Sequence, residues 1–528
     1  MNEPGSLPGH DIQRLVLHEA PCGWVQHVIV SFPEQAGGRH FLRCALQDYP
    51  LTPADRPRQD GDLHVGLGFS FRGLERLHLP APVLGELYAR APAFAAGAAL
   101  RAAEHLGDTG ASAAWRWDPC FALDEAHAVF SLHAATEEAL LPVAARLCRL
   151  AKAYRVKSHP LRGRHIGAPQ GEQGQWVHFG FRDALTRVVV RGWHTPRDSL
   201  PVSQHAAGEF LLGHVNDHGF NPWLLPNAHA DVRRFFHNGS FGVLRQMEQD
   251  VVGFDDWVRE RADWLRDRFE VSTEAVGGGG APTSIGAPQP PSWTDYVKAK
   301  VCGRWPDGSR FSRKTGWSAP GGAAPETDFD YSEDREGLGC PFGAHTRRMN
   351  PRLARPDAQA RRFAGDQAQE EHGDAQQDRH PDARPHSRAP EGVAHARHRP
   401  LIRRGRPYGP MWHPDQGADG VPRGLLGLFF CASLEDQFEH LLGQWAERPP
   451  LGVNDIGDAK DPLIGHHENP SSRFHIPLPG GRSVDLLGLR AFVRTRGTLY
   501  AFHPSLSALS LMLDNPKFYD LPEAPLQP

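Results

Sequence analysis

Four short strings of this sequence contain residue types that can take part in proton transfer, charge stabilisation or metal binding. They are GFRD with Asp183, GCPFGAHTRRMNPR with His345, LIRRGRPYGP with Arg403 and DPLIG with Asp461. A carboxylate can move a proton, a guanidinium can stabilise negative charge, and a neutral imidazole can bind a metal. Their spacing alone does not join the four strings into one site.

Each of the four residues also has a purely structural interpretation, which local sequence alone favours. Asp183 is typical of a turn or a helix cap, and Asp461 stands before a proline, where turns begin. His345 could be a hydrogen-bonded structural histidine, and Arg403 could belong to a solvated basic run. These alternatives stay open until the rest of the chain is considered.

The remaining histidines and the cysteines give no motif. The seven cysteines are scattered and never spaced C-x-x-C, which argues against a disulfide framework, a cysteine-rich zinc site and covalent haem attachment. A reducing cytoplasm fits this pattern. His372, His380, His386 and His395 lack zinc-type spacing and are expected to be solvated. His466 and His467 are expected at the surface.

The first 160 residues alternate between strand-like and helix-like stretches. Residues 28–32 and 126–132 are predicted strands, and residues 83–105 have helical spacing that ends at Gly107. Thr136 stands at an N-cap position before the amphipathic stretch EEALLPVAARLCRLAKAY. This β–α–β rhythm predicts an α+β sandwich, with helices on a sheet.

The second half repeats that rhythm. GLLGLFFC (424–431) and VRTRGTLYAF (493–502) are predicted strands, and Ser433 is placed to cap the helix LEDQFEHLLGQW. With 528 residues the chain is too long for one core, since single cores stop growing near about 250–300 residues. Two domains or a duplicated unit are therefore expected, although no residue-level repeat is visible.

Composition limits the possible partners and the location. Lys and Arg number 58 against 62 Asp and Glu, a net charge of −4 that gives no case for nucleic acid. No window holds 18 consecutive apolar residues, so no membrane helix is predicted. The first residues contain neither a secretory leader nor a twin-arginine signal, which predicts a cytoplasmic protein.

Two segments are expected to be unstructured. Residues 275–291 are rich in Gly and Pro and are typical of a flexible linker. Residues 353–394 contain almost no large apolar side chains and cannot bury enough surface to offset their ordering entropy. A long flexible loop costs little in closure entropy, so a site could survive this insertion.

The four strings belong to a collinear set that runs nearly end to end. Further members include GFSFRGLERLHLP (68–80), AAGAALRAAEHLGDTG (95–110), NGSFGVLRQMEQDVVGF (238–254) and LYAFHPSLSAL (499–509). In order and spread this set resembles the dye-decolorising haem peroxidases of the long bacterial kind.

The resemblance implies a fold of two ferredoxin-like α+β halves, with antiparallel sheets and haem b bound without covalent links in the C-terminal half. The corresponding boundaries are an N-terminal domain over 1–175, a connecting segment with the GFRD loop over 176–230, and a haem-binding domain over 231–528. Oligomeric state is left open, with a homo-oligomer possible.

The resemblance also assigns roles on one side of the haem. His345, in the CPFGAH string, corresponds to the proximal iron ligand. Such a ligand needs a partner on its other nitrogen, and Asp461 is the candidate by position. Arg347, two residues after the ligand, could pair with a haem propionate or could be a plain surface arginine.

On the distal side the resemblance assigns the proton relay to Asp183 and charge stabilisation to Arg403, which is expected to contribute more to the rate. The implied activity is reduction of hydrogen peroxide to water through a ferryl intermediate, with aromatic or dye-like molecules as electron donors. Position 184 is Ala where relatives have Gly, which could crowd the site. A haem-binding homologue with impaired activity, serving storage or sensing, is therefore the alternative.

Overall fold

The computed structural model describes most of the chain, and contacts divide it into two compact units. Unit 1 comprises Met1–Asp250, Pro400–His440 and Arg494–Pro528, and unit 2 comprises Val251–Arg399 and Leu441–Val493. The described residues are 7–18, 23–33, 35–57, 63–167, 175–183, 188–193, 203–274, 292–311, 331, 334–350, 399–449, 459–469 and 471–521. Ala184 and both segments expected to be unstructured, 275–291 and 353–394, lie outside them. Within the described residues, no helix is long and apolar enough to cross a membrane.

Unit 1 begins with a four-stranded antiparallel arrangement in the order β4-β1-β3-β2. Its strands are β1 (Trp24–Ser31), β2 (His64–Phe69), β3 (Ala128–Ala134) and β4 (Lys157–Arg164). Both faces of β2 and β3 are buried, so their apolar, β-branched and aromatic side chains are packed on each side. The strands predicted near residues 28–32 and 126–132 are thereby confirmed.

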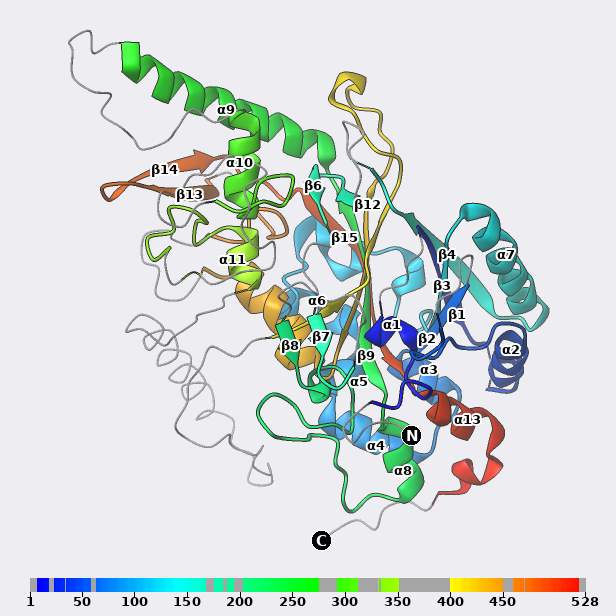
Figure 1. The fold of residues 1–528 in the computed structure, drawn as a ribbon. Coiled ribbons are helices and arrows are strands. Elements are labelled where there is room, and N and C mark those ends of the chain that lie inside the picture. Colours follow the sequence, from blue (N-terminus) through cyan, green and yellow to red (C-terminus); the bar gives the residue numbers. More distant parts are fainter. Residues whose placement is uncertain are drawn as a thin grey trace. The chain divides into compact units, whose positions relative to one another are not determined.

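Two helices cover one face of these strands. Helix α7 (Glu137–Ala153) contacts β1, β3 and β4, and α2 (Gln35–Asp48) packs beside it (Figure 1). The predicted cap of α7 is confirmed, since the Thr136 hydroxyl accepts a hydrogen bond from the Ala139 amide at 3.3 Å. The resulting βαββαβ order with strand sequence 4-1-3-2 is ferredoxin-like.

A second set of strands in the same sheet repeats this order. The strands run β10-β12-β9-β15, and β11 also pairs with β12. Their bounds are β9 (Ser240–Gln249), β10 (Ile402–Arg403), β11 (Arg406–Tyr408), β12 (Gly424–Cys431) and β15 (Val493–His503). β12 coincides with the predicted apolar run, and η7 (Leu434–Ala446), a π-helix, follows it. The Ser433 hydroxyl accepts from the Asp436 amide at 3.0 Å, as its predicted capping role requires.

The two sets of strands meet where β15 pairs with β2, through Phe502 opposite Phe69. The predicted α+β fold with two ferredoxin-like halves is therefore confirmed. The contact-based units do not correspond to these halves, because unit 1 contains both sets of strands. The domain boundaries near residues 175 and 230 stay predictions.

The helical stretch predicted over residues 83–105 is divided into three helices, which corrects the sequence prediction. They are α4 (Ala81–Arg90), α5 (Pro92–Ala96) and α6 (Ala98–His105). Pro92 begins α5, and Gly97 separates α5 from α6 with a φ of +81° that L-residues rarely adopt. The helical spacing of apolar side chains continues across both breaks, so the spacing alone did not indicate them.

The shorter elements of unit 1 connect these parts. The helices are α1 (Arg14–Leu17), α3 (Phe71–Arg76), α8 (Ala230–Phe236) and α13 (Leu506–Asp514). The strands are β5 (Trp176–Val177), β6 (Phe181–Arg182), β7 (Val188–Val190) and β8 (Ser203–His205). β5 and β6 form a small antiparallel pair immediately before Asp183.

The described residues of unit 2 include three α-helices and a hairpin, and the end of η7 also lies in this unit. Helices α9 (Val251–Glu274) and α10 (Trp293–Cys302) pack together, and α10 contacts α11 (His345–Met349). The hairpin consists of β13 (Arg473–Leu478) and β14 (Arg482–Leu487). The described stretch 334–344 has no helix or strand, and side-chain hydrogen bonds to its backbone hold it in place.

Candidate active site

Helix α11 begins at His345, so this histidine stands where a loop turns into a short helix. Its side chain is 30% exposed, and its Nδ1 lies 2.9 Å from Oδ2 of Asp461. The partner is 116 residues away in the sequence. With Asp461 ionised, Nδ1 carries the proton, and the lone pair of Nε2 is left for a ligand.

Asp461 is fully buried and satisfied on both oxygens. Its Oδ1 accepts from the amides of Leu463 and Ile464 at 2.9 and 3.1 Å, while Oδ2 faces His345. Burial alone would raise the pKa of Asp461, but His345, followed by Arg348 and the amide of Leu463, brings it below its usual value. An ionised carboxylate is therefore held against the imidazole.

Arg348 lies three residues after His345 on α11 and is itself buried. Its guanidinium donates to the carbonyls of Gly343, Trp445, Arg448 and Ala459. Burial lowers its pKa to about 10, which leaves it charged near neutral pH. The cation thus connects α11 with the segments that precede Asp461.

The loop before His345 is held by a second group of charged side chains. Asp334 accepts from the amides of Gly339 and Cys340 at 3.0 and 2.8 Å. Lys300, on α10, donates to the carbonyls of Leu338 and Gly339, and burial lowers its pKa to about 8. These contacts fix the chain that enters α11.

Arg347 takes part in the same group. Its guanidinium donates to the Asp334 carboxylate at 3.2 Å and to the Cys340 carbonyl at 2.8 Å. It also stacks on the rings of Tyr331 and Phe342 at 4.5 and 4.3 Å from their centroids. These contacts bind Arg347 to its own loop, and its pairing with a propionate stays a prediction.

The two residues predicted for the distal side lie in unit 1. Arg403 is the exposed second residue of β10, opposite Phe429 of β12. Asp183 directly follows β6, is half-buried, and its amide donates to the Gln175 carbonyl at 2.7 Å. Both are therefore placed by strands, and their roles stay predictions.

His466 and His467 are buried, which corrects the expectation that they lie at the surface. The Nδ1 of His466 is 2.9 Å from Glu447, and His467 donates from Nε2 to the Asp461 carbonyl at 2.8 Å. His467 therefore supports the backbone that carries Asp461. Local sequence did not indicate this, because Glu447 lies 19 residues before His466 and meets it only in the fold.

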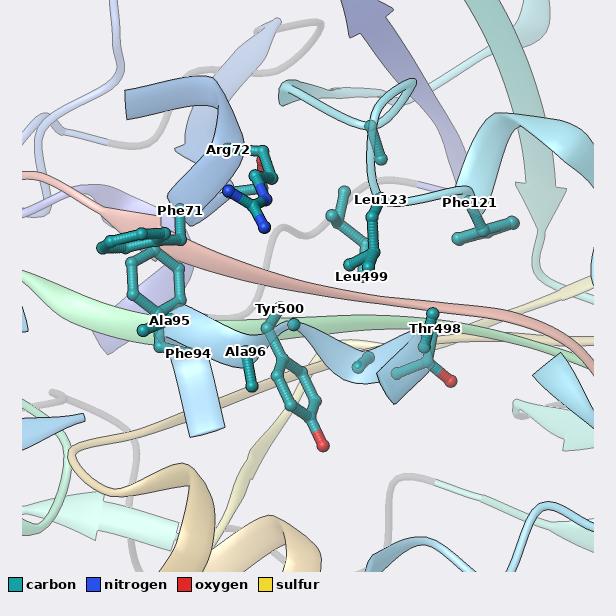
Figure 2. Close-up of a pocket in the computed structure, with 15 residues that line it drawn as sticks. Phe71, Arg72, Phe94, Ala95, Ala96, Phe121, Leu123, Thr498, Leu499 and Tyr500 are labelled. Atoms are coloured by element: carbon teal, nitrogen blue, oxygen red, sulfur yellow. The ribbon is translucent and has the colours of Figure 1, made fainter. Parts of the chain in front are cut away.

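Unit 1 also contains a pocket. None of the predicted site residues is among the described residues that line it. Figure 2 shows Phe71 and Phe94 on one side, Leu499 and Tyr500 of β15 nearer the middle, and Thr498 of the same strand on the other side. Its arginine, Arg72, pairs with Glu75 at 2.7 Å. The Tyr500 hydroxyl donates to the buried Glu439 at 2.9 Å. The lining thus offers apolar surface rather than a metal ligand.

Comparison with known proteins relates this arrangement to a family. No family model matches the chain. The multifunctional dye peroxidase DyP2 of Amycolatopsis is 27% identical over 96% of this chain and 94% of its own length. The dye-decolorizing peroxidase msp1 of Mycetinis scorodonius is 25% identical over 85% and 76%, respectively.

This chain is similar to dye-decolorizing peroxidases over nearly its whole length. A solved dye-decolorizing peroxidase in complex with 2,6-dimethoxyphenol shares the fold, with a TM-score of 0.66, 21% identity and coverage of 96% of this chain and 99% of the other. A dye-decolorizing peroxidase of Auricularia auricula-judae in complex with imidazole gives a TM-score of 0.65 at 20% identity, over 97% of this chain.

The donor set of this chain fits haem. A histidine can hold haem iron, and a hydrogen bond from its other nitrogen to a carboxylate makes the histidine a stronger ligand. His345 and Asp461 form that arrangement at 2.9 Å, with the imidazole partly exposed and the carboxylate fully buried. The predicted pairing of these two residues is thus found in the geometry.

Proposed function

We propose that this protein is a haem peroxidase, which reduces hydrogen peroxide to water and oxidises aromatic or dye-like electron donors. The observation that carries the proposal is the His345–Asp461 pair, a histidine poised for metal ligation in a chain homologous to dye-decolorizing peroxidases. Haem b, bound without covalent links, would supply the iron that binds peroxide and stores its oxidising equivalents.

In this proposal His345 would hold the haem iron through Nε2, while Asp461 accepts the hydrogen bond from Nδ1. The carboxylate fixes the tautomer and the ring orientation, and it makes the imidazole a stronger donor. Two backbone amides hold Asp461 in place, so contacts within the protein fix the carboxylate that faces His345. Such preorganisation lowers the cost of binding.

The distal residues would move a proton and stabilise charge. Asp183 would take a proton from one oxygen of hydrogen peroxide and return it to the other, which would leave as water. Arg403 would stabilise the negative charge that develops on the leaving oxygen. The bound haem would supply the two electrons that this step needs, and the aromatic donor would restore them one at a time.

Steady-state oxidation of a phenol such as 2,6-dimethoxyphenol tests the proposal. Protein reconstituted with haem should oxidise the phenol only when peroxide is added, and His345→Ala should lose the activity together with its haem. His475→Ala is the matched control, because His475 also pairs with an aspartate at 2.9 Å but in the β13–β14 hairpin. Haem binding without peroxide-dependent turnover would contradict the proposed enzyme.

A further inference from the structure

Arg348 hydrogen-bonds the backbone two residues before His345 and also two residues before Asp461. It donates from Nε to the carbonyl of Gly343, two residues before His345, at 3.0 Å. From Nη2 it donates to the carbonyl of Ala459, two residues before Asp461. One planar cation therefore ties together the two chain segments that deliver the pair.

The remaining donors of Arg348 reach a third segment. Nη1 donates to the carbonyls of Trp445 and Arg448 at 3.0 and 2.8 Å, at the end of η7 and just after it. All four acceptors are neutral carbonyls, and the side chain is buried. A lysine has three donors on one atom and no fixed plane, so it cannot reproduce these four directions.

We infer that Arg348 is the positioning residue of the proximal pair, holding His345 and Asp461 at hydrogen-bond distance. Charge supports the same arrangement, because the nearby guanidinium favours the ionised carboxylate that the imidazole requires. The inference rests on the proposed function for its relevance to haem, while the hydrogen bond that it concerns joins two residues of the protein itself.

The first test uses the apo-protein. The Nδ1 proton of His345 should give a far-downfield proton resonance, identified by its loss in Asp461→Asn. Arg348→Lys should shift or broaden that resonance strongly. Arg43→Lys is the control, since Arg43 also donates twice to a backbone carbonyl, that of Leu513, but in unit 1. An unshifted resonance in folded Arg348→Lys would overturn the inference.

The second test separates positioning from mere stabilisation. After haem reconstitution, Arg348→Lys should weaken haem binding about tenfold, at the low end of the effect of outer partners of metal ligands, and should raise the iron reduction potential. In the Asp461→Asn background the same substitution should leave the potential unchanged, because the hydrogen bond is already lost. Equal shifts of potential in both backgrounds would overturn the inference.

Folding controls keep these outcomes decisive. If Arg348→Lys does not fold, Arg348→Gln, which retains one amide donor group, takes its place. If neither variant folds, Arg348 anchors unit 2 as a whole and the inferred role at the pair is wrong. If the wild type binds no haem through His345 but the apo resonance responds as expected, the proposed function fails and the positioning role stands.

Discussion

His345 and Arg403 are proposed to serve one reaction, but the chain holds them in different ways. Arg403 lies on β10, whose backbone pairs with β12, and the next residue, Arg404, donates its amide to Leu428 at 2.7 Å. His345 follows irregular chain, and buried side chains such as Lys300, Asp334 and Arg348 bind the backbone around it.

The difference shows two ways of ordering a functional side chain. A strand residue is positioned by backbone hydrogen bonds that every residue type except proline can form, so it tolerates most changes in its neighbours. A loop residue depends on particular side chains that satisfy backbone carbonyls and amides. The proximal side should therefore be sensitive to substitutions that do not touch haem, and the distal side mainly to substitutions of the reacting groups themselves.

The largest effect is expected at Arg403. Arg403→Leu should lower the rate of the reaction with peroxide about 10²–10³-fold, because removal of one stabiliser of transition-state charge has that typical cost. Stopped-flow absorbance of the haem-loaded protein measures the rate. Arg482→Leu, an exposed arginine in β14, should leave the rate unchanged.

Asp183→Asn should lower that rate by less than Arg403→Leu, since the arginine is predicted to contribute more. An unchanged rate in Arg403→Leu would show that the distal charge comes from elsewhere.

On the proximal side, Asp461→Asn should weaken haem affinity about 10–100-fold and raise the iron reduction potential, because the amide cannot accept the Nδ1 proton as a carboxylate does. Haem transfer to a scavenger protein and redox titration measure the two quantities. Asp485→Asn removes the carboxylate of the His475 pair and should change neither. If Asp461→Asn and Asp485→Asn had the same haem affinity and the same iron reduction potential, the proposed role of Asp461 would be wrong.

A third prediction concerns acid stability in unit 1. His27 is fully buried on β1, and burial, followed by Arg406, lowers its pKa to about 3. The unfolded chain therefore binds the proton first, and the free energy of unfolding falls as pH drops from 6.5 towards 3. Between pH 7 and pH 5 this histidine should cost roughly 2 kcal/mol.

Urea unfolding at pH 7 and pH 5 measures that loss. His27→Gln removes the titrating group and should lose roughly 2 kcal/mol less than the wild type over this interval. His105→Gln, at an exposed position of α6, should behave like the wild type. Equal pH dependence in the wild type and His27→Gln would mean that the buried histidine is charged when folded.

The smallest effect is expected at the start of α7. Thr136→Ala removes the hydroxyl that accepts from the Ala139 amide and should lower the free energy of unfolding by about 1 kcal/mol. Thr136→Ser keeps the hydroxyl and should restore most of it. If Thr136→Ser lowered the free energy of unfolding as much as Thr136→Ala, the effect would come from the lost methyl group rather than from capping.

Local patterns predicted elements whose causes are local. Thr136 and Ser433 cap their helices through their own hydroxyls, and the apolar run 424–431 forms β12 over the same residues. The helical stretch after Val83 was predicted as one element because periodicity ignores backbone breaks. Pro92 and Gly97 were visible in the sequence and could have indicated the divisions.

The site depended on information that local patterns do not contain. Asp461 meets His345 across 116 residues, so only the resemblance to a family could pair them. The buried positions of His466 and His467 follow from partners that are brought near by the fold. The role of Arg348 was missed, because four carbonyl acceptors leave no mark in a sequence.

The central claim, that His345 ligates haem with Asp461 behind it, is tested most directly by an absorbance titration of the apo-protein with haemin. The wild type should bind one equivalent and give the Soret and visible bands of a histidine-ligated ferric haem. His345→Ala should lose this spectrum, and added imidazole should restore it, because the free ligand can occupy the vacated position. An unchanged spectrum in His345→Ala would contradict the account.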